Sequence, residues 1–330
     1  MKVLVVRLSS IGDVVHTLPA RAALERAGHR VSWLVEPAAE PLVDAGSVRV
    51  FRLPKAKAFS LSAAGATLAA LRAERHDVAL DFQGLWKSAS WAHLSGASRC
   101  IGFASAFRRE PASSILLGER VEQPAAAVHV IDKNLALLRA LGIDALGTRE
   151  FPLPADTLAA ESVVRQLKQR NLGDFAVLNP GGGWANKLWP VERFGALGPP
   201  LRARGLVPLV TFGPGEEAVA ERVVAASNGS VERAFPTTLL ELVELLRRAR
   251  LLIAGDTGPL HIACALATPV VGLYGPTDPA RNGPFSAADV VVRKTPACAP
   301  CHKRACPEHD GIMATLPVEE VVAAIERRLS

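Results

Sequence analysis

The chain has 330 residues, of which 49% are hydrophobic and 21% are charged. This composition is typical of a globular protein and excludes a mainly disordered or fibrous chain, and the length favours two domains. Most of the net charge of +6 comes from residues 1–155. A basic half suits an acidic partner, although an ordinary solvated surface explains the charge equally well.

The first half of the chain alternates short apolar runs with helical patterns. We expect a helix at Val14–Ala27 and strands at Lys2–Leu8, Val31–Val35, Val78–Phe82, Cys100–Phe103 and Val128–Ile131. Apolar strands that are separated by helices predict a parallel sheet covered on both faces.

The turn after the first predicted strand contains Ser9, Ser10, Gly12 and Asp13. It has no G-x-G-x-x-G pattern, which counts against the usual dinucleotide fingerprint. Asp13 is suited either to capping the following helix or to acting as a general base at a strand end. The pattern alone favours the cap.

A linker is expected where Pro152 and Pro154 impose an extended conformation. The predicted domains are therefore residues 1–154 and 155–330. A second series of strands is expected at Phe175–Asn179, Val207–Phe212, Leu251–Ala254, Val270–Tyr274 and Val290–Val292, with a last helix at Val318–Leu329. The predicted architecture is two Rossmann-like, doubly wound α/β domains, with ligands beyond the carboxyl ends of the strands in a cleft between them.

Two segments of the second half carry candidate chemistry. In the first, Asp256 follows the buried strand Leu251–Ala254, Thr257 or Gly258 can cap the next helix, and His261 lies in its first turn. Such a helix start is an anion site, although a well-capped helix with a packed histidine explains the pattern equally well.

The second segment is the glycine-rich stretch 179–190, which contains Gly182, Gly183 and Lys187. Its glycines let a ligand approach the backbone, and the lysine can neutralise phosphate; a plain flexible loop is the alternative. It is not a P-loop, because no Lys-Ser/Thr pair follows the glycines.

Cys298, Cys301 and Cys306 form a C-x2-C-x4-C pattern, with His302 and His309 nearby. A closed zinc site needs four ligands, so we expect no functional metal here. No D-x-D motif occurs, which gives no support to a metal–diphosphate site.

Taken together, these segments resemble glycosyltransferase family 9, the ADP-heptose:lipopolysaccharide heptosyltransferases. The resemblance covers nearly the whole chain and rests on Val3–Ala20, Asp81–Ser88, Arg109–Ser113, Asp256–His261 and Tyr274–Asp278. The first half is most similar to heptosyltransferase I, which acts on Kdo-lipid A. The cysteine segment is more similar to heptosyltransferase II, but Ile312 stands where those relatives have a further cysteine.

The resemblance implies a GT-B fold and an inverting transfer that needs no metal or other cofactor. The first domain would bind the acceptor and the second the nucleotide sugar. Asp13 aligns with the proposed catalytic base and Lys187 with the lysine that binds donor phosphate. The other implied donor residues are Gly182, Gly183, Glu216, Asp256, Thr257, Gly258 and His261. Candidates for the acceptor are Ser9, Ser10, Gly12, Arg108, Arg109 and the Arg49–Lys57 loop with Lys55 and Lys57.

The expected partners are an ADP-heptose donor and an anionic glycolipid of the Kdo-lipid A type, with no nucleic acid. The chain shows no export signal and few cysteines, so we expect it in the cytoplasm, with peripheral contact at the inner membrane surface. Two alternatives remain open. One is another GT-B sugar-nucleotide enzyme, such as a heptosyltransferase of type II, an enzyme with a different acceptor or an epimerase, and the other is a basic nucleic-acid-binding protein. Only 5% of the residues are aromatic, which disfavours the last class.

Overall fold

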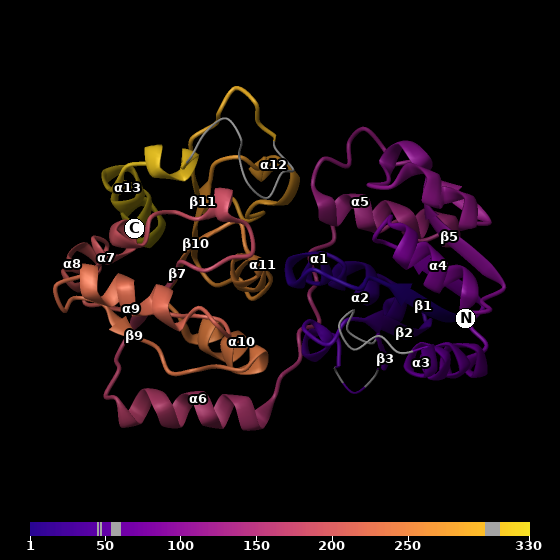
Figure 1. Ribbon diagram of the computed structural model, residues 1–330, viewed down its shortest axis with the longest axis horizontal. Coiled ribbons are helices and arrows are strands. Elements are labelled where there is room, and N and C mark those ends of the chain that lie inside the picture. The colour runs from indigo at the N-terminus through magenta and orange to yellow at the C-terminus, as the bar shows by residue number, and fades with distance from the viewer. Residues whose placement is uncertain (45, 47, 54–60, 301–310) are drawn as a thin grey trace. The chain divides into compact units, whose positions relative to one another are not determined.

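The computed structural model describes residues 1–330 except 45, 47, 54–60 and 301–310. The chain divides into two compact units, Met1–Ala155 and Asp156–Ser330 (Figure 1). Each unit has its own six-stranded sheet, and all the paired strands in the described residues are parallel.

The first unit is built on the strand order β3-β2-β1-β4-β5-β6. Its strands are β1 (Lys2–Val6), β2 (Arg30–Val35), β3 (Arg49–Arg52), β4 (Val78–Asp81), β5 (Arg99–Phe103) and β6 (Glu119–Val121). Its α-helices are α1 (Ile11–Val15), α2 (Leu18–Arg26), α3 (Leu61–Glu74), α4 (Trp86–Leu94) and α5 (Val130–Leu137). The 3-10 turns are η1 (Glu40–Leu42), η3 (Ser105–Phe107), η4 (Pro111–Leu116) and η5 (Leu138–Leu141). All four residues of β4 are buried, as expected of a central strand covered on both faces.

The second unit repeats this arrangement with the strand order β12-β11-β10-β7-β8-β9. Its strands are β7 (Phe175–Asn179), β8 (Val207–Val210), β9 (Glu232–Arg233), β10 (Leu251–Gly255), β11 (Val270–Tyr274) and β12 (Val290–Arg293). Its longer helices are α6 (Thr157–Gln169), α9 (Glu217–Ala226), α10 (Leu239–Arg248), α11 (Gly258–Ala265) and α13 (Val318–Leu329). The shorter ones are η6 (Ala185–Lys187), α7 (Val191–Gly195), α8 (Gly198–Arg202), α12 (Pro279–Asn282) and η7 (Ile312–Thr315).

The two doubly wound parallel sheets that the sequence predicts are confirmed, but the details differ at several elements. The predicted strand Val128–Ile131 is wrong: His129 accepts a hydrogen bond from the Ile131 N–H at 3.2 Å and caps helix α5. Its short apolar run fits a buried helix as well as a strand. The predicted helix Val14–Ala27 is interrupted, because a new helix starts after Thr17 with Pro19 in its first turn.

The strands that the sequence did not predict, β3, β6 and β9, are short and rich in charged residues, and all lie at sheet edges. Charged side chains protect an edge strand from pairing with another chain. They also remove the apolar run by which a strand is recognised.

In both sheets the strand order reverses at one point, between β1 and β4 and between β7 and β10. Doubly wound proteins bind ligands beyond the carboxyl ends of the strands at such a switch point. The segments that follow these four strands are therefore the first places to search for a site.

His76 is an unusual buried group in the first unit. It is only 2% exposed. Its ring packs edge-on against Phe51. Burial lowers the pKa of His76, whereas Glu74 raises it; the charges of Lys2 and Arg49 lower it further, and a hydrogen bond with the Leu71 backbone opposes them.

Candidate functional site

Asp13 lies at the switch point of the first sheet, in the turn after β1. One carboxylate oxygen accepts hydrogen bonds from the Ser10 N–H at 3.2 Å and from the Ser10 hydroxyl at 3.0 Å. Asp13 therefore caps helix α1, as the pattern predicted. Its side chain is nevertheless 41% exposed, so the cap leaves the carboxylate accessible. Ser9 is half-buried beside it, and Gly12 is buried within the helix.

The other oxygen of Asp13 accepts a hydrogen bond from Nη2 of Arg7 at 2.7 Å. The Arg7 side chain is 7% exposed, and its Nη1 donates to the Phe82 carbonyl at 2.6 Å. Arg7 thus connects Asp13 to the segment that follows β4. Our sequence reasoning missed this residue, although it is the one charged residue in the apolar run Val3–Leu8.

A second set of hydrogen bonds joins the ends of β1 and β4. The Leu8 N–H donates to the Gln83 side chain at 2.7 Å, and the Gln83 N–H donates to Asp81 at 3.0 Å. Both strand ends, and the turn that carries Asp13, are therefore held in a single network. This network fixes the position of the turn and of the Asp13 carboxylate.

The basic residues predicted for the acceptor differ in their environment. Arg108 is buried: its Nη2 is 2.6 Å from Asp81, both side chains are 0% exposed, and its Nε donates to Ser113 at 2.9 Å. Its position does not support the prediction that it contacts the acceptor, because it holds together the interior of the unit. Arg109 is exposed. Lys55 and Lys57 lie outside the described residues.

The predicted Arg49–Lys57 loop begins instead as strand β3. Arg49 is paired with Glu74, and Arg52 is paired with Glu40 at 2.6 Å. These carboxylates, distant in the sequence, compensate part of the basic excess that the sequence shows. The free positive charge of this surface is smaller than the composition indicates.

In the second unit, the residues around Asp256 form a buried polar cluster at the switch point between β7 and β10. Lys187 places its Nζ 2.6 Å from Asp256 Oδ2. The other oxygen, Oδ1, is 3.2 Å from Nε2 of His261 and accepts a hydrogen bond from the Asn282 amide at 2.7 Å. The Asp256 side chain is 3% exposed. Asn282 is a further residue that our sequence reasoning missed.

Electrostatics keep the Asp256 carboxyl ionised. Burial alone would raise its pKa, but the hydrogen bonds from His261 and Lys187 and the positive charge of Lys187 hold the pKa below its ordinary value. His261 is therefore more than a packing residue. The cluster offers a charged acceptor beside a charged donor, which suits recognition of hydroxyl and phosphate groups.

The start of helix α11 lies directly beside this cluster. Thr257 is the N-cap, Gly258 is the first helical residue, and Pro259 occupies the first turn. The pattern 255–259 predicted this geometry. The free N–H groups and the positive end of the helix dipole make this position favourable for an anion.

The glycine-rich segment approaches the same helix start. A Cβ atom on Gly182 would lie 2.8 Å from the Thr257 methyl group, and one on Gly181 would lie 2.2 Å from the Glu216 carboxylate. Any larger residue at Gly182 would therefore displace Thr257, whereas one at Gly181 would require the flexible Glu216 side chain to move. Gly183 faces open space, where a ligand can approach the backbone.

Lys187 is held from a second side by an aromatic ring. Its Nζ lies 4.7 Å from the centre of the Trp184 ring, within the range of a cation–π interaction. Glu216 accepts a hydrogen bond from the Gly213 N–H at 2.9 Å. The structure thus brings the glycine segment, Lys187, Glu216 and the start of α11 together in the second unit.

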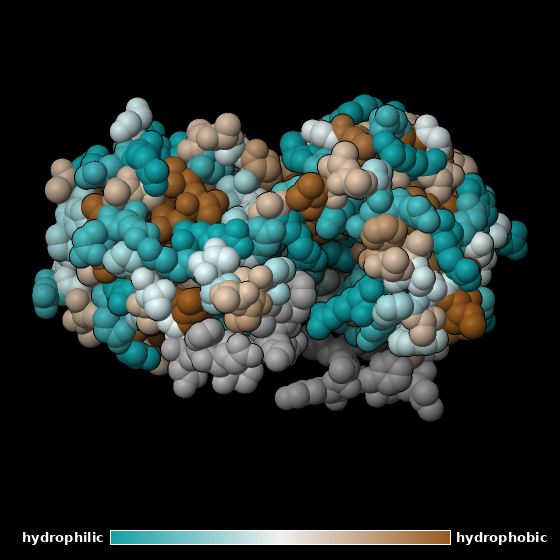
Figure 2. All heavy atoms as spheres, turned by 90° about the horizontal axis from the view of Figure 1, so that it is seen from above, coloured by the Kyte–Doolittle hydropathy of each residue, from teal (hydrophilic) through white to brown (hydrophobic). Residues whose placement is uncertain are grey.

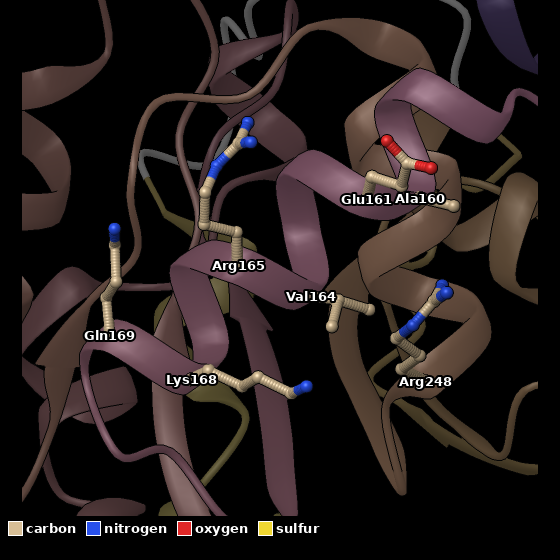
Figure 3. Close-up of a pocket in the computed structure, with 7 residues that line it drawn as sticks. All are labelled: Ala160, Glu161, Val164, Arg165, Lys168, Gln169 and Arg248. Carbon is tan, nitrogen blue, oxygen red and sulfur yellow. The ribbon is translucent and has the colours of Figure 1, made fainter.

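A groove between α6 and α10 contains none of the predicted site residues (Figure 3). It is lined by Ala160, Glu161, Val164, Arg165, Lys168, Gln169 and Arg248. Arg248 is already paired with Glu244 at 2.6 Å, so part of the positive charge of the groove is compensated.

The predicted cysteine pattern falls mainly outside the described residues, which include Cys298 but not Cys301, His302, Cys306 or His309. Cys298 is exposed, and the rest of the described chain has no cluster of three metal-ligating side chains. No helix in the described residues is long and apolar enough to cross a membrane. On the face seen in Figure 2, apolar side chains form separate patches among hydrophilic ones.

Comparison with known proteins identifies the class to which this fold and these sites belong. The family model for glycosyltransferase family 9 (heptosyltransferase) matches residues 65–311. The chain belongs to this family, and it is a glycosyltransferase with the GT-B fold.

Individual relatives extend the similarity over nearly the whole chain. The chain is 29% identical to lipopolysaccharide heptosyltransferase 1 of Pseudomonas aeruginosa, over 93% of this chain and 87% of that protein. It is 30% identical to lipopolysaccharide heptosyltransferase 1 of Escherichia coli K12, over 89% of this chain and 93% of that protein. The solved structure of E. coli heptosyltransferase WaaC with ADP-2-deoxy-2-fluoro heptose is 26% identical, with a TM-score of 0.76 and 99% of each chain covered.

Proposed function

We propose that this heptosyltransferase transfers heptose from ADP-heptose to an anionic glycolipid of the Kdo-lipid A type. The observation that carries this proposal is the buried cluster of Lys187, Asp256 and His261 at the start of helix α11. It combines a phosphate-binding group with a sugar-binding group at a switch point. The names of the relatives and the ADP-heptose analogue bound to WaaC support the donor and the acceptor.

The second unit supplies the donor site in this proposal. The start of α11 at Thr257 and Gly258 and the ammonium of Lys187 bind the diphosphate, and Asp256 accepts hydrogen bonds from hydroxyl groups of the heptose. Gly182 and Gly183 border the nucleotide, and Glu216 binds its ribose. As ADP leaves, its growing negative charge is stabilised by groups that are already in place, so this step needs no metal ion.

The first unit supplies the base. Asp13 removes the proton from an acceptor hydroxyl while that oxygen forms a bond to the anomeric carbon and the bond from this carbon to phosphate breaks. The electron pair leaves with ADP, and the single displacement inverts the configuration. Arg7 orients the carboxylate, which is the role of the third group in many nucleophile–base arrangements.

The acceptor is held by the surface beside Asp13 that includes Ser9, Ser10 and Gly12. Exposed Arg109 binds its anionic groups, and Lys55 and Lys57 remain candidates for the same role. An acceptor with lipid chains requires access to a membrane, so we place the enzyme at the inner face of the inner membrane. The net positive charge supports this peripheral contact.

The proposal is tested by measuring ADP release and glycolipid mass with purified protein. ADP-heptose is compared with UDP-glucose and GDP-mannose, each with Kdo-lipid A, with lipid A lacking Kdo, and without acceptor. We expect transfer only from ADP-heptose to Kdo-lipid A. Transfer to an already heptosylated acceptor alone would instead show the second heptosyltransfer. A changed donor in the absence of acceptor would show an epimerase.

A further inference from the structure

The Asp256 carboxylate is supported from three different segments of the second unit. Lys187 comes from the segment after β7, His261 from α11, and Asn282 is the last residue of α12. The Asn282 amide nitrogen is 2.7 Å from Oδ1 of Asp256. Because an ionised carboxylate only accepts hydrogen bonds, this amide must present its N–H₂ group to it.

These contacts occupy most of the hydrogen-bond acceptor positions of the Asp256 carboxylate. A carboxylate has about four acceptor positions, and in the described structure Lys187, His261 and Asn282 occupy three of them. One position is then free for a sugar hydroxyl. A second becomes free only where Lys187 leaves Oδ2 for the diphosphate of the donor.

Lys187 and Asn282 differ in how firmly they are held. Lys187 has a long, charged side chain, and a diphosphate attracts it. The amide of Asn282 is neutral, and its backbone is fixed: the Asn282 carbonyl accepts a hydrogen bond from the Tyr274 hydroxyl at 3.4 Å, and the Asp278 side chain caps α12 through the Ala280 N–H at 3.2 Å. A diphosphate therefore attracts the Lys187 ammonium, whereas it exerts no such attraction on the neutral amide of Asn282.

We propose that Asn282 is a positioning residue for the donor sugar, which holds Asp256 Oδ1 so that Oδ2 stays directed at the heptose when Lys187 moves to the diphosphate. This inference rests on the proposed function, in which Asp256 binds the sugar. Asn282 acts through Asp256 and needs no contact with the substrate of its own.

The test compares Asn282→Ala with Arg281→Ala, a control at the adjacent exposed position of the same short helix. Affinities for ADP and for ADP-heptose are measured by calorimetry, and kcat and KM are measured for heptose transfer. We expect Asn282→Ala to keep the ADP affinity within about twofold and to raise the KM for ADP-heptose roughly tenfold, the scale on which orienting hydrogen bonds act. Arg281→Ala should behave like the wild type.

A double-mutant cycle separates positioning from a general structural role. If Asn282 acts through Asp256, Asn282→Ala has little further effect on ADP-heptose binding in an Asp256→Asn background. Asn282→Asp, which keeps the side-chain shape but places a second carboxylate against Asp256, should weaken ADP-heptose binding more than Asn282→Ala. This variant keeps the test meaningful if the alanine variant folds poorly.

Two results would overturn the inference while leaving the proposed function intact. One is an equal loss of ADP and ADP-heptose affinity in Asn282→Ala, and the other is full additivity with Asp256→Asn. Wild-type protein that transfers no heptose from ADP-heptose would overturn the proposed function and the inference together.

Discussion

The ion pair between Arg108 and Asp81 gives the sharpest test of how the first unit is built. Both side chains are 0% exposed, and the guanidinium also donates to Ser113. The substitution Arg108→Ala removes the positive partner and leaves Asp81 buried, where its remaining hydrogen bonds come from the N–H groups of Gln83 and Gly84.

The expected cost follows from this geometry. Removing one partner of a buried pair destabilises a protein by about 3–5 kcal/mol, because the other charge is left without compensation. For a domain of this size, each kcal/mol lowers the Tm by about 2–4 °C, so the Tm of the first unit should fall by about 6–20 °C. Arg108→Lys keeps the charge but loses the planar fork, and it should recover part of the loss.

Thermal unfolding, followed by circular dichroism and calorimetry, measures this change. Arg109→Ala is the matched control, because this neighbouring side chain is exposed and its loss should change the stability by less than about 0.5 kcal/mol. We expect Arg109→Ala to raise the KM for the acceptor instead. An Arg108→Ala protein with an unchanged Tm and a raised acceptor KM would refute the reasoning, and it would restore Arg108 as an acceptor residue.

Asp13→Asn should retain the fold, since asparagine also caps helices, and should lower kcat by at least about 10²-fold; normal turnover would limit Asp13 to capping. Lys187→Ala should lower turnover of the ADP-sugar by about one to two decades, because a charge-assisted contact to phosphate is lost, and unchanged ADP affinity and kcat would contradict this role. The pKa of buried His76 is lowered in the folded protein, so as the pH falls the unfolded chain binds a proton at this residue before the folded chain does. The stability that His76 contributes is therefore present above about pH 6.5 and is lost as the pH falls below that value. His76→Phe should therefore reduce the fall in Tm between pH 7.5 and 5.5, and an equal fall in both proteins would count against it. Chelation should leave transfer intact and lower the Tm little, whereas stoichiometric zinc or iron found by elemental analysis, with unfolding on its removal, would show that the cysteine segment does form a site.

The central strands and the turns that follow them were predictable from the sequence alone. Strands such as Val270–Tyr274 are continuous apolar runs because both faces of a parallel sheet are covered. The start of α11 was equally clear, since Thr257, Gly258 and Pro259 have strong local preferences for the beginning of a helix. These features depend on neighbours in the sequence.

Only the tertiary structure decided which charged side chains are exposed and can contact a ligand, and which are buried in ion pairs. Arg108 and Arg109 are adjacent in the sequence, yet one is buried against Asp81 and the other is exposed. Asn282 escaped the sequence reasoning because its partner Asp256 is distant in the chain, and Arg7 escaped it because an apolar strand pattern does not show that its side chain joins Asp13 to the end of the neighbouring strand at Phe82. Local pattern predicts the central strands, but the environment of a charge depends on which strand ends the sheet places side by side, and the parallel order of the strands determines that.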